Sequence, residues 1–466
     1  MKLRVDLTAL ILAIASVSAC TDPTVPSKEL SVSSARVTSS GPTVKSTLPS
    51  SAPQNITLDV SISGSGFEPG SVAQWLLNGS PDPRVKTNSS SVVNSTSMTA
   101  NITIAEDALP ALYDVAVITP MGKKGIGTEK FTVLAMEQLS APSGSSGAHD
   151  INSSGVIAGS VAGGCDGYNL PAVWTSGNPS TLPLPPGLCR GRALRISDGG
   201  VVIGQAYAAG ATSLTQSVPL IWKPDGDSYS VQELGVTEYG RPYDILSANE
   251  SSHAVVMIGI YYGKAFWWSE ATGFVEVKYP ANATGCYLND VSDTDQIVGS
   301  CQWEFPNSTP NRNFNAVFWS SPTADPVVLP RMAGYNYSHS PSAINNNGIV
   351  VGQVWNSAKS GLKKAGARWI QSGSTWTVEL LPNLGGGETY PKDINDDGWV
   401  TGHSFVSTGR AHAFLWRAGS IIRDLGAIGN ESWAEAITSS GSVETLIVGS
   451  SSLANDNRAV VWHPDR

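Results

Sequence analysis

Short runs of alternating apolar and polar residues fill the segment that follows the N-terminal region. Two clear examples are residues 56–62 (ITLDVSI) and residues 113–118 (YDVAVI). An alternation with a period of two places successive side chains on opposite faces of a strand, and turn residues separate the runs. The pattern therefore predicts a small β-sandwich over residues 29–134.

A longer pattern recurs through the rest of the chain, residues 135–466. Its clearest copy reads DINDDGWVTG at 393–402, AHAFLW at 411–416 and IIRDLG at 421–426. Seven copies, with 46–51 residues between successive tryptophans, form a repeat array. We assign one glycine to the end of the second strand of each copy: Gly159, Gly204, Gly259, Gly299, Gly352, Gly402 and Gly449. The third strand of each copy ends in tryptophan: Trp174, Trp222, Trp268, Trp319, Trp369, Trp416 and Trp462.

Turn signals divide each copy into four short strands, which in the sixth copy are expected at 391–395, 399–405, 411–417 and 421–427. Four strands in a unit of this length suit one blade of a β-propeller, so the array predicts a seven-bladed ring and an all-β chain. We expect the tryptophans to pack between neighbouring blades, where burial of each ring contributes about 2–3 kcal/mol.

The last copy ends after its third strand, at residues 462–466. The segment before the first copy, residues 131–139 (FTVLAMEQL), reads as a strand without a blade of its own. We therefore expect Val133–Leu139 to complete the last blade and close the ring, which also removes exposed sheet edges.

Two stretches of the chain resemble known families. Residues 62–71 (ISGSGFEPGS) resemble the signature of IPT/TIG immunoglobulin-like domains, and residues 111–122 resemble that family's later strand pair, with Ala111 in place of the usual glycine. The repeat resembles the bacterial HAF-repeat family of extracellular proteins, named for the triplet that stands here at 412–414. The first resemblance implies a spacer or docking domain. The second implies a propeller and leaves the biochemical role open.

The N-terminus has the features of a targeting segment. Lys2 and Arg4 precede an apolar stretch, residues 7–15, that is too short to span a bilayer. Residues 17–20 (VSAC) resemble the lipobox of bacterial lipoproteins, which implies a signal peptide over 1–19, a diacylglycerol on Cys20 and a polar tether over 20–28. By that family's sorting rule, Thr21 implies the outer membrane, on its periplasmic or cell-surface side. An ordinary signal peptide with a chance cysteine, or a buried N-terminal strand, is the alternative.

Four further cysteines in an exported chain favour disulfides over metal thiolates, and no Cys-x-x-Cys spacing is present. The hairpin of the fourth copy turns around residues 293–294, with Cys286 seven residues before it and Cys301 seven after it. These two should face each other. Cys165 and Cys189 then remain to join the long loops of the first copy.

Composition excludes one class of partner. The formal net charge is −9, only 14% of residues are charged, and Lys and Arg form no run. Nucleic-acid binding requires a basic surface, so we expect no nucleic-acid partner.

The connections between second and third strands, and between successive units, share one end of a propeller and are long here. Long loops on a rigid ring commonly carry recognition, and aromatic rings suit glycans or peptide side chains, although such rings can equally pack loop against loop. We take as candidate ligand-binding residues Trp303, Arg312, Tyr335, Tyr337, His339, Tyr239, Arg241, Tyr390 and Trp433, with Tyr207 and Trp355 at the same end.

One turn matches the beginning of a calcium loop. Asp393, Asn395 and Asp397 alternate before Gly398, but no distal glutamate follows, and the same residue types favour hairpin turns. We therefore expect a structural turn here, and calcium, the one cofactor that the sequence suggests, is the alternative.

No zinc-protease, nucleophile-elbow or phosphate-loop motif is present, and we assign no catalytic residue. We expect a cell-envelope lipoprotein that acts as a non-catalytic binding or scaffold module for a glycan or protein partner. The alternatives are a carbohydrate-active enzyme, such as a polysaccharide lyase or glycosidase, and a purely structural envelope component.

Overall fold

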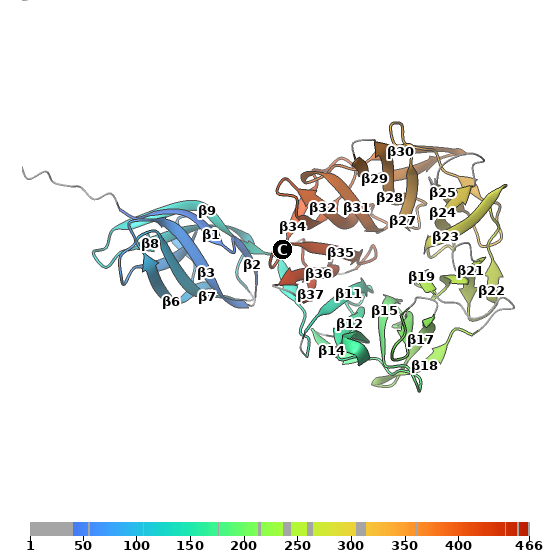
Figure 1. Ribbon diagram of the computed structural model, residues 1–466, viewed down its shortest axis with the longest axis horizontal. Helices are drawn as coiled ribbons and strands as arrows, with labels where there is room; N and C mark the ends of the chain where they lie inside the picture. The colour runs from blue at the N-terminus through green and yellow to red at the C-terminus, as the bar shows by residue number, and fades with distance from the viewer. Residues whose placement is uncertain are drawn as a thin grey trace, which may run out of the picture. The chain divides into compact units, whose positions relative to one another are not determined.

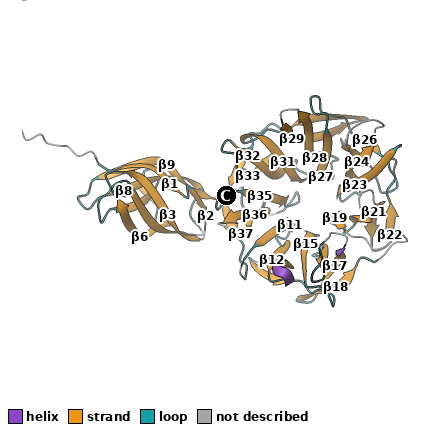
Figure 2. Ribbon diagram, viewed as in Figure 1, coloured by secondary structure: helices purple, strands orange, loops and turns teal. Residues whose placement is uncertain are grey.

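The computed structural model describes residues 41–464 apart from 55, 106, 143, 176, 213–215, 236–243, 259–263, 304–313, 359–360, 443 and 454–455. Nearly all of its regular structure is β-strand (Figure 2). The expected signal peptide, Cys20 and the tether lie outside the described residues. No helix in the described part of the chain has the length and apolar character needed to cross a membrane.

Residues 43–134 form two sheets around one core. The first contains, in spatial order, β1 (Thr43–Leu48), β3 (Ile56–Ser65), β7 (Ser97–Ile104) and β6 (Val85–Asn94). The second contains β2 (Ser51–Pro53), β9 (Lys124–Leu134), β8 (Ala111–Ile118), β4 (Val72–Leu77) and β5 (Ser80–Pro81). Alternate residues of each strand point inward, and Ile62, Trp75 and Phe131 meet in the shared core.

Seven four-stranded antiparallel sheets, here numbered sheets 1 to 7, follow in the described residues and form a β-propeller (Figure 1). The strands of sheets 1 to 3 are β11 (Ser146–Ile151), β12 (Ile157–Ala162), β13 (Asn169–Thr175) and β14 (Asn178–Thr181); β15 (Arg190–Ile196), β16 (Val202–Tyr207), β17 (Val218–Asp225) and β18 (Ser228–Glu233); and β19 (Asp244–Ala248), β20 (Ala254–Ile258), β21 (Lys264–Ser269) and β22 (Gly273–Glu276).

Sheets 4 to 7 repeat the same order. Their strands are β23 (Ala283–Val291), β24 (Ile297–Trp303), β25 (Phe314–Trp319) and β26 (Val327–Val328); β27 (Ser338–Ile344), β28 (Val350–Ala358), β29 (Gly361–Ser372) and β30 (Thr375–Leu380); β31 (Gly385–Ile394), β32 (Val400–Val406), β33 (Ala411–Trp416) and β34 (Arg423–Gly426); and β35 (Ser432–Ile437), β36 (Ile447–Leu453), β37 (Asp456–Trp462) and β10 (Met136–Gln138).

The ring closes through a strand from upstream of the array. β10 pairs with β37, with Glu137 opposite Val461, and supplies the fourth strand of sheet 7. The expected closure is therefore confirmed, but the strand is shorter than 133–139 because Val133 pairs with Ala111 in the preceding sandwich. Sheets 1 and 7 also share a core, in which Trp174 and Val448 are both buried.

The repeated tryptophans are buried at matching positions of the third strands. Each lies opposite the first residue of its second strand, as Trp174 lies opposite Ile157 and Trp369 opposite Val350. The indole Nε1 of Trp174 donates to the carbonyl of Ser140, and that of Trp222 donates to the carbonyl of Pro183. The rings thus fill the core of the sheets, as expected, and in sheets 1, 2, 4 and 5 the indole also holds the connection that leads into the sheet.

The repeated glycines lie within the second strands rather than at their ends. Each faces the carbonyl of a first-strand residue next to a β-bulge; a Cβ on Gly352 would lie 2.3 Å from the carbonyl oxygen of Ser340. In sheet 3 the register places Val256 at the corresponding position, and the expected Gly259 lies outside the described residues.

Both expected disulfides are present. Cys286 lies directly opposite Cys301 in the β23–β24 pair, with their Cα atoms 4.0 Å apart. Cys165, in the short 3₁₀ helix η1 (Cys165–Gly167), is bonded to Cys189, which precedes β15. The second bond therefore joins a loop of sheet 1 to the connection that enters sheet 2.

Candidate binding pocket at the long-loop end

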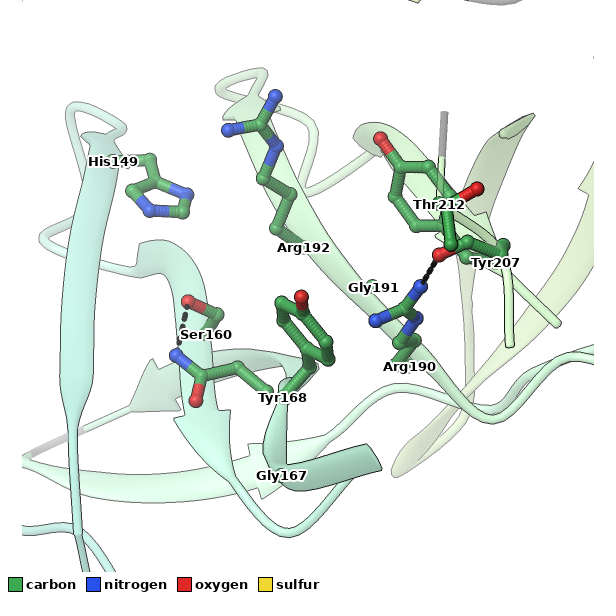
Figure 3. A pocket seen from close by; sticks show the side chains of 11 residues that line it. His149, Ser160, Gly167, Tyr168, Arg190, Gly191, Arg192, Tyr207 and Thr212 are labelled. Carbon is green, nitrogen blue, oxygen red and sulfur yellow. Dashed lines mark hydrogen bonds between the residues drawn. The ribbon is translucent and has the colours of Figure 1, made fainter. Parts of the chain in front are cut away.

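We call the end of the propeller that carries the connections between second and third strands the long-loop end. A cavity of about 560 Å³ opens there between sheets 1 and 2 (Figure 3). Its polar and aromatic lining consists of His149, Ser160, Tyr168, Asn169, Arg190, Arg192, Tyr207 and Thr212. We refer to it as the Arg190 pocket.

The Cys165–Cys189 disulfide fixes one wall of this pocket. The backbone N–H of Cys165 donates to the carbonyl of Cys189 at 3.0 Å, and the N–H of Cys189 donates to the carbonyl of Tyr207, also at 3.0 Å. Tyr168 follows η1 directly, and its N–H donates to the carbonyl of Cys165. The loop that presents Tyr168 is thereby tied to the start of β15, which presents Arg190.

Arg190 lies between two tyrosine rings. Its guanidinium carbon is 4.0 Å from the centroid of the Tyr168 ring and 5.6 Å from that of Tyr207. Nη2 donates a hydrogen bond to the carbonyl of Ala211. The Arg190 side chain is almost fully buried, whereas Tyr168 is 60% exposed and offers an open aromatic surface.

The rest of the lining supplies polar groups that are already oriented. The Asn169 amide donates to Ser160 Oγ at 3.2 Å. His149 Nδ1 lies 2.7 Å from the carbonyl of Ala193, so Nδ1 carries the proton and Nε2 is an acceptor. Burial lowers the pKa of His149, which keeps the imidazole neutral at pH 7. The pocket therefore combines an aromatic face with both donors and acceptors.

Three residues that the sequence analysis placed at this end, Tyr337, Trp355 and Tyr390, come together in a different place, at sheets 5 and 6. The ring of Tyr337 stacks on Trp355 at 6.5 Å, and that of Tyr390 stacks on His403 at 4.6 Å. Lys364 Nζ links the two pairs, 5.0 Å from the Trp355 ring and 5.5 Å from the Tyr390 ring. We call these five residues the aromatic ladder; it also lies at the long-loop end.

The remaining candidates that the structure describes are not gathered into a site. His339 is buried, its Nε2 accepts from the N–H of Met332 at 2.9 Å, and burial lowers its pKa to about 4. Tyr335 packs against the core shared by sheets 4 and 5, and Trp303 donates to the carbonyl of Ala281 in its own hairpin. Trp433 is half-buried on β35. Arg312, Tyr239 and Arg241 lie outside the described residues.

The three residues of the calcium-loop pattern each have a separate protein partner. Asp393 accepts from the N–H of Ile437 at 2.9 Å. Asn395 accepts from the N–H of Trp399, and the exposed Asp397 donates its N–H to Ser440 Oγ at 2.8 Å. Within the described residues, no group of three or more His, Cys, Asp and Glu side chains is placed to hold a metal ion.

Sequence reasoning missed the role of the charged residues of the first strands, although it named Asp393 as a calcium-loop candidate. Asp150, Asp290 and Asp393 surround Arg195 at the centre of the ring. Their negative charges raise the pKa of its guanidinium. Each carboxylate accepts the backbone N–H of an isoleucine in the next sheet, as Asp150 accepts from Ile196 at 2.8 Å. Burial raises the pKa of Asp150 to about 7 and that of Asp290 to about 6. These hydrogen bonds connect neighbouring sheets to each other.

The Arg190 pocket was also missed, apart from Tyr207. Tyr168 and Arg190 belong to two different connections, and only the ring geometry together with the disulfide brings them into contact. The available signal was local: both residues lie within three positions of a cysteine that the sequence already paired.

No protein-family model matches the chain, and no curated protein is similar to it. Similar solved structures include the β-propeller domain of the Trilobed protease from Pyrococcus furiosus, with 13% identity, 68% of this chain and 95% of that chain covered, and a TM-score of 0.45. An ancestral GH74 enzyme has 9% identity, with 87% and 63% covered and a TM-score of 0.44. TolB from Acinetobacter baumannii has 14% identity, with 59% and 61% covered and a TM-score of 0.32. At such identities and TM-scores these similarities assign no function to this chain.

Proposed function

We propose that the chain is a membrane-anchored saccharide-binding protein of the cell envelope. In this proposal a seven-bladed HAF-repeat propeller presents the Arg190 pocket, and the N-terminal sandwich is an IPT/TIG-like spacer. The observation that carries the proposal is the composition of the pocket. The exposed face of Tyr168 can pack on the apolar face of a sugar ring, while Asn169, Ser160 and His149 supply hydrogen-bonding groups for its hydroxyls.

Two further features support an envelope location. Disulfides persist in oxidising compartments outside the cytosol, and the chain has two of them. The lipobox-like residues 17–20 would attach the chain to a membrane through Cys20. In this proposal the lipid on Cys20 inserts into the outer membrane, and the propeller carries the pocket at the membrane surface.

A glycan array probed with the detergent-purified full-length protein tests this function. We expect selective binding of a subset of oligosaccharides, and we expect Tyr168→Ala to weaken that binding at least about 10-fold because one ring-stacking face is lost. Tyr390→Ala, in the aromatic ladder, is the matched control and should leave the affinity unchanged. Binding that depends on Tyr390 instead would move the site to the ladder, and an array without any specific binding would refute the proposal.

A second candidate is a polysaccharide lyase. It is favoured by the neutral His149, whose Nε2 is available as an acceptor in the same pocket as two phenols and an arginine. Such an enzyme would release unsaturated sugars, which absorb ultraviolet light. Product formation that His149→Ala abolishes while binding persists would favour the enzyme, whereas binding without product would favour the binding protein.

A further inference from the structure

Arg190 is a buried cation without a carboxylate partner. Arg190 is only 6% exposed to solvent. In the described part of the chain it makes no ion pair, and its guanidinium donates a single hydrogen bond, from Nη2 to the carbonyl of Ala211. Nε is buried and has no acceptor there. Burial of an uncompensated charge is costly, so a residue in this state points to a missing counter-charge.

Three other arginines of the chain, Arg84, Arg458 and Arg195, have carboxylates nearby. Arg84 pairs with Asp82 at 2.8 Å, and Arg458 pairs with Asp456 at 3.4 Å. Arg195, at the centre of the ring, interacts with three aspartates. Arg190 differs from these in having tyrosine rings and a carbonyl around it where they have carboxylates.

The charged side chains that line the pocket are basic. Among the described lining residues they are Arg190 and the exposed Arg192, and none of these lining residues is an aspartate or glutamate. This is notable in a chain with a net charge of −9. The two tyrosine rings and the Ala211 carbonyl hold the Arg190 guanidinium in one orientation, so little side-chain freedom would be lost when a ligand binds.

We infer that the Arg190 pocket binds the carboxylate of an acidic saccharide, a uronate or another sugar acid. A planar guanidinium matches a carboxylate in charge and geometry, and a carboxylate would supply the counter-charge that Arg190 lacks. The exposed Tyr168 face then packs on the sugar ring, and Arg192 adds a second, solvent-exposed cation. This inference rests on the proposed saccharide-binding function and specifies its ligand class.

The experiment uses the full-length protein and isothermal titration calorimetry. The probes are trisaccharides of galacturonate, mannuronate and glucuronate, each compared with its carboxyl-reduced neutral form, and a sulfated trisaccharide. We expect an acidic probe to bind and its neutral form to bind about 100-fold more weakly. Arg190→Met should raise the Kd of the acidic probe by about 100-fold, and Arg190→Lys by about 10-fold, because lysine retains the charge but not the planar fork.

Arg417→Met is the matched control. Arg417 also lies over an aromatic ring, 4.5 Å from that of Trp399, but outside the pocket, so its loss should leave the Kd unchanged. Thermal unfolding of each variant checks that the ring remains folded, and Arg190→Lys provides a second test if Arg190→Met does not fold.

The outcomes separate the two proposals. Equal binding of an acidic probe and its neutral form, or full binding by folded Arg190 variants, overturns the inference and leaves saccharide binding standing. Preference for the sulfated probe over every uronate overturns the assignment to a carboxylate. Absence of binding to all acidic and neutral probes, together with a blank array, overturns the proposed function itself.

Discussion

At the scale of single residues, a close approach of backbone explains the repeated glycine. In the sheets where it occurs, a first-strand carbonyl beside a bulge occupies the place that a side chain would need; for Gly204 that oxygen belongs to Arg192. The repeated glycine could be recognised in the sequence, but the reason for it could not. The reason is a β-bulge, and no particular residue type marks a bulge in the sequence. Sheet 3 carries Val256 at this position, so the ring accommodates one exception.

Gly352→Ala should therefore destabilise the propeller. The new Cβ would meet the carbonyl oxygen of Ser340 at 2.3 Å and Cα of Pro341 at 2.5 Å, and relief of such overpacking costs about 3 kcal/mol. Gly199→Ala is the control, since its Cβ would come no closer than 3.8 Å to a neighbour. Urea unfolding monitored by tryptophan fluorescence measures both; equal midpoints would contradict this steric explanation.

At the scale of elements, the first strands both line the centre and join the sheets. The sequence favoured a structural turn at 393–398 over a calcium loop, and the structure places Asn395 between the turn N–H of Trp399 and the carbonyl of Thr438 in sheet 7. The role of Asp393 could not be derived from the local sequence, because its partner Ile437 lies in the next repeat. Hydrogen bonds between sheets, such as this one, depend on which repeats are neighbours in the ring.

The charge at the centre gives a prediction about pH. Because burial raises the pKa of Asp150 to about 7 in the folded protein, the stability associated with this group is fully present below its ordinary pKa of 3.8 and is lost as pH rises through 7. Asp150→Asn keeps an acceptor for Ile196 but does not ionise. Relative to the native chain, the variant should gain on the order of 2 kcal/mol between pH 5 and pH 8.

Urea unfolding of both proteins at the two pH values measures this difference. The comparison between variant and native chain is needed because His339 and His403, whose pKa values burial lowers to about 4, change stability in the opposite direction over the same range. A difference that does not vary with pH would show that Asp150 is ionised in the folded ring.

At the scale of the whole molecule, the repeat period and the missing fourth strand were enough to predict a propeller and its closure. The surface that we propose for binding was predicted only as one end of the ring. Candidate residues were chosen for aromatic content, which is highest in the later loops, whereas the Arg190 pocket lies between sheets 1 and 2. A cavity depends on how neighbouring loops meet, and that is not encoded in the period of the repeat.

Closure should matter for the stability of the entire ring. Met136 of β10 is fully buried against Trp462 and Val460, so Met136→Ala should lower the free energy of unfolding by about 3 kcal/mol. Hydrogen exchange should become faster in all seven sheets, because opening of sheet 7 exposes the edges of its neighbours. Met121→Ala, at a residue 80% exposed, is the control. Faster exchange confined to sheet 7 would mean that closure is only locally important.

The pairing of β10 with β37 also has a consequence for folding during synthesis. β10 is synthesised before the first sheet and β37 after the other strands of the array, so the ring cannot close until β37 has been made. Contacts between segments so distant in sequence form slowly. Until they form, the incomplete ring exposes unpaired strand edges that are prone to aggregation. Chains that a stop codon ends before β37 should therefore aggregate or be degraded, and should not persist as shortened functional proteins.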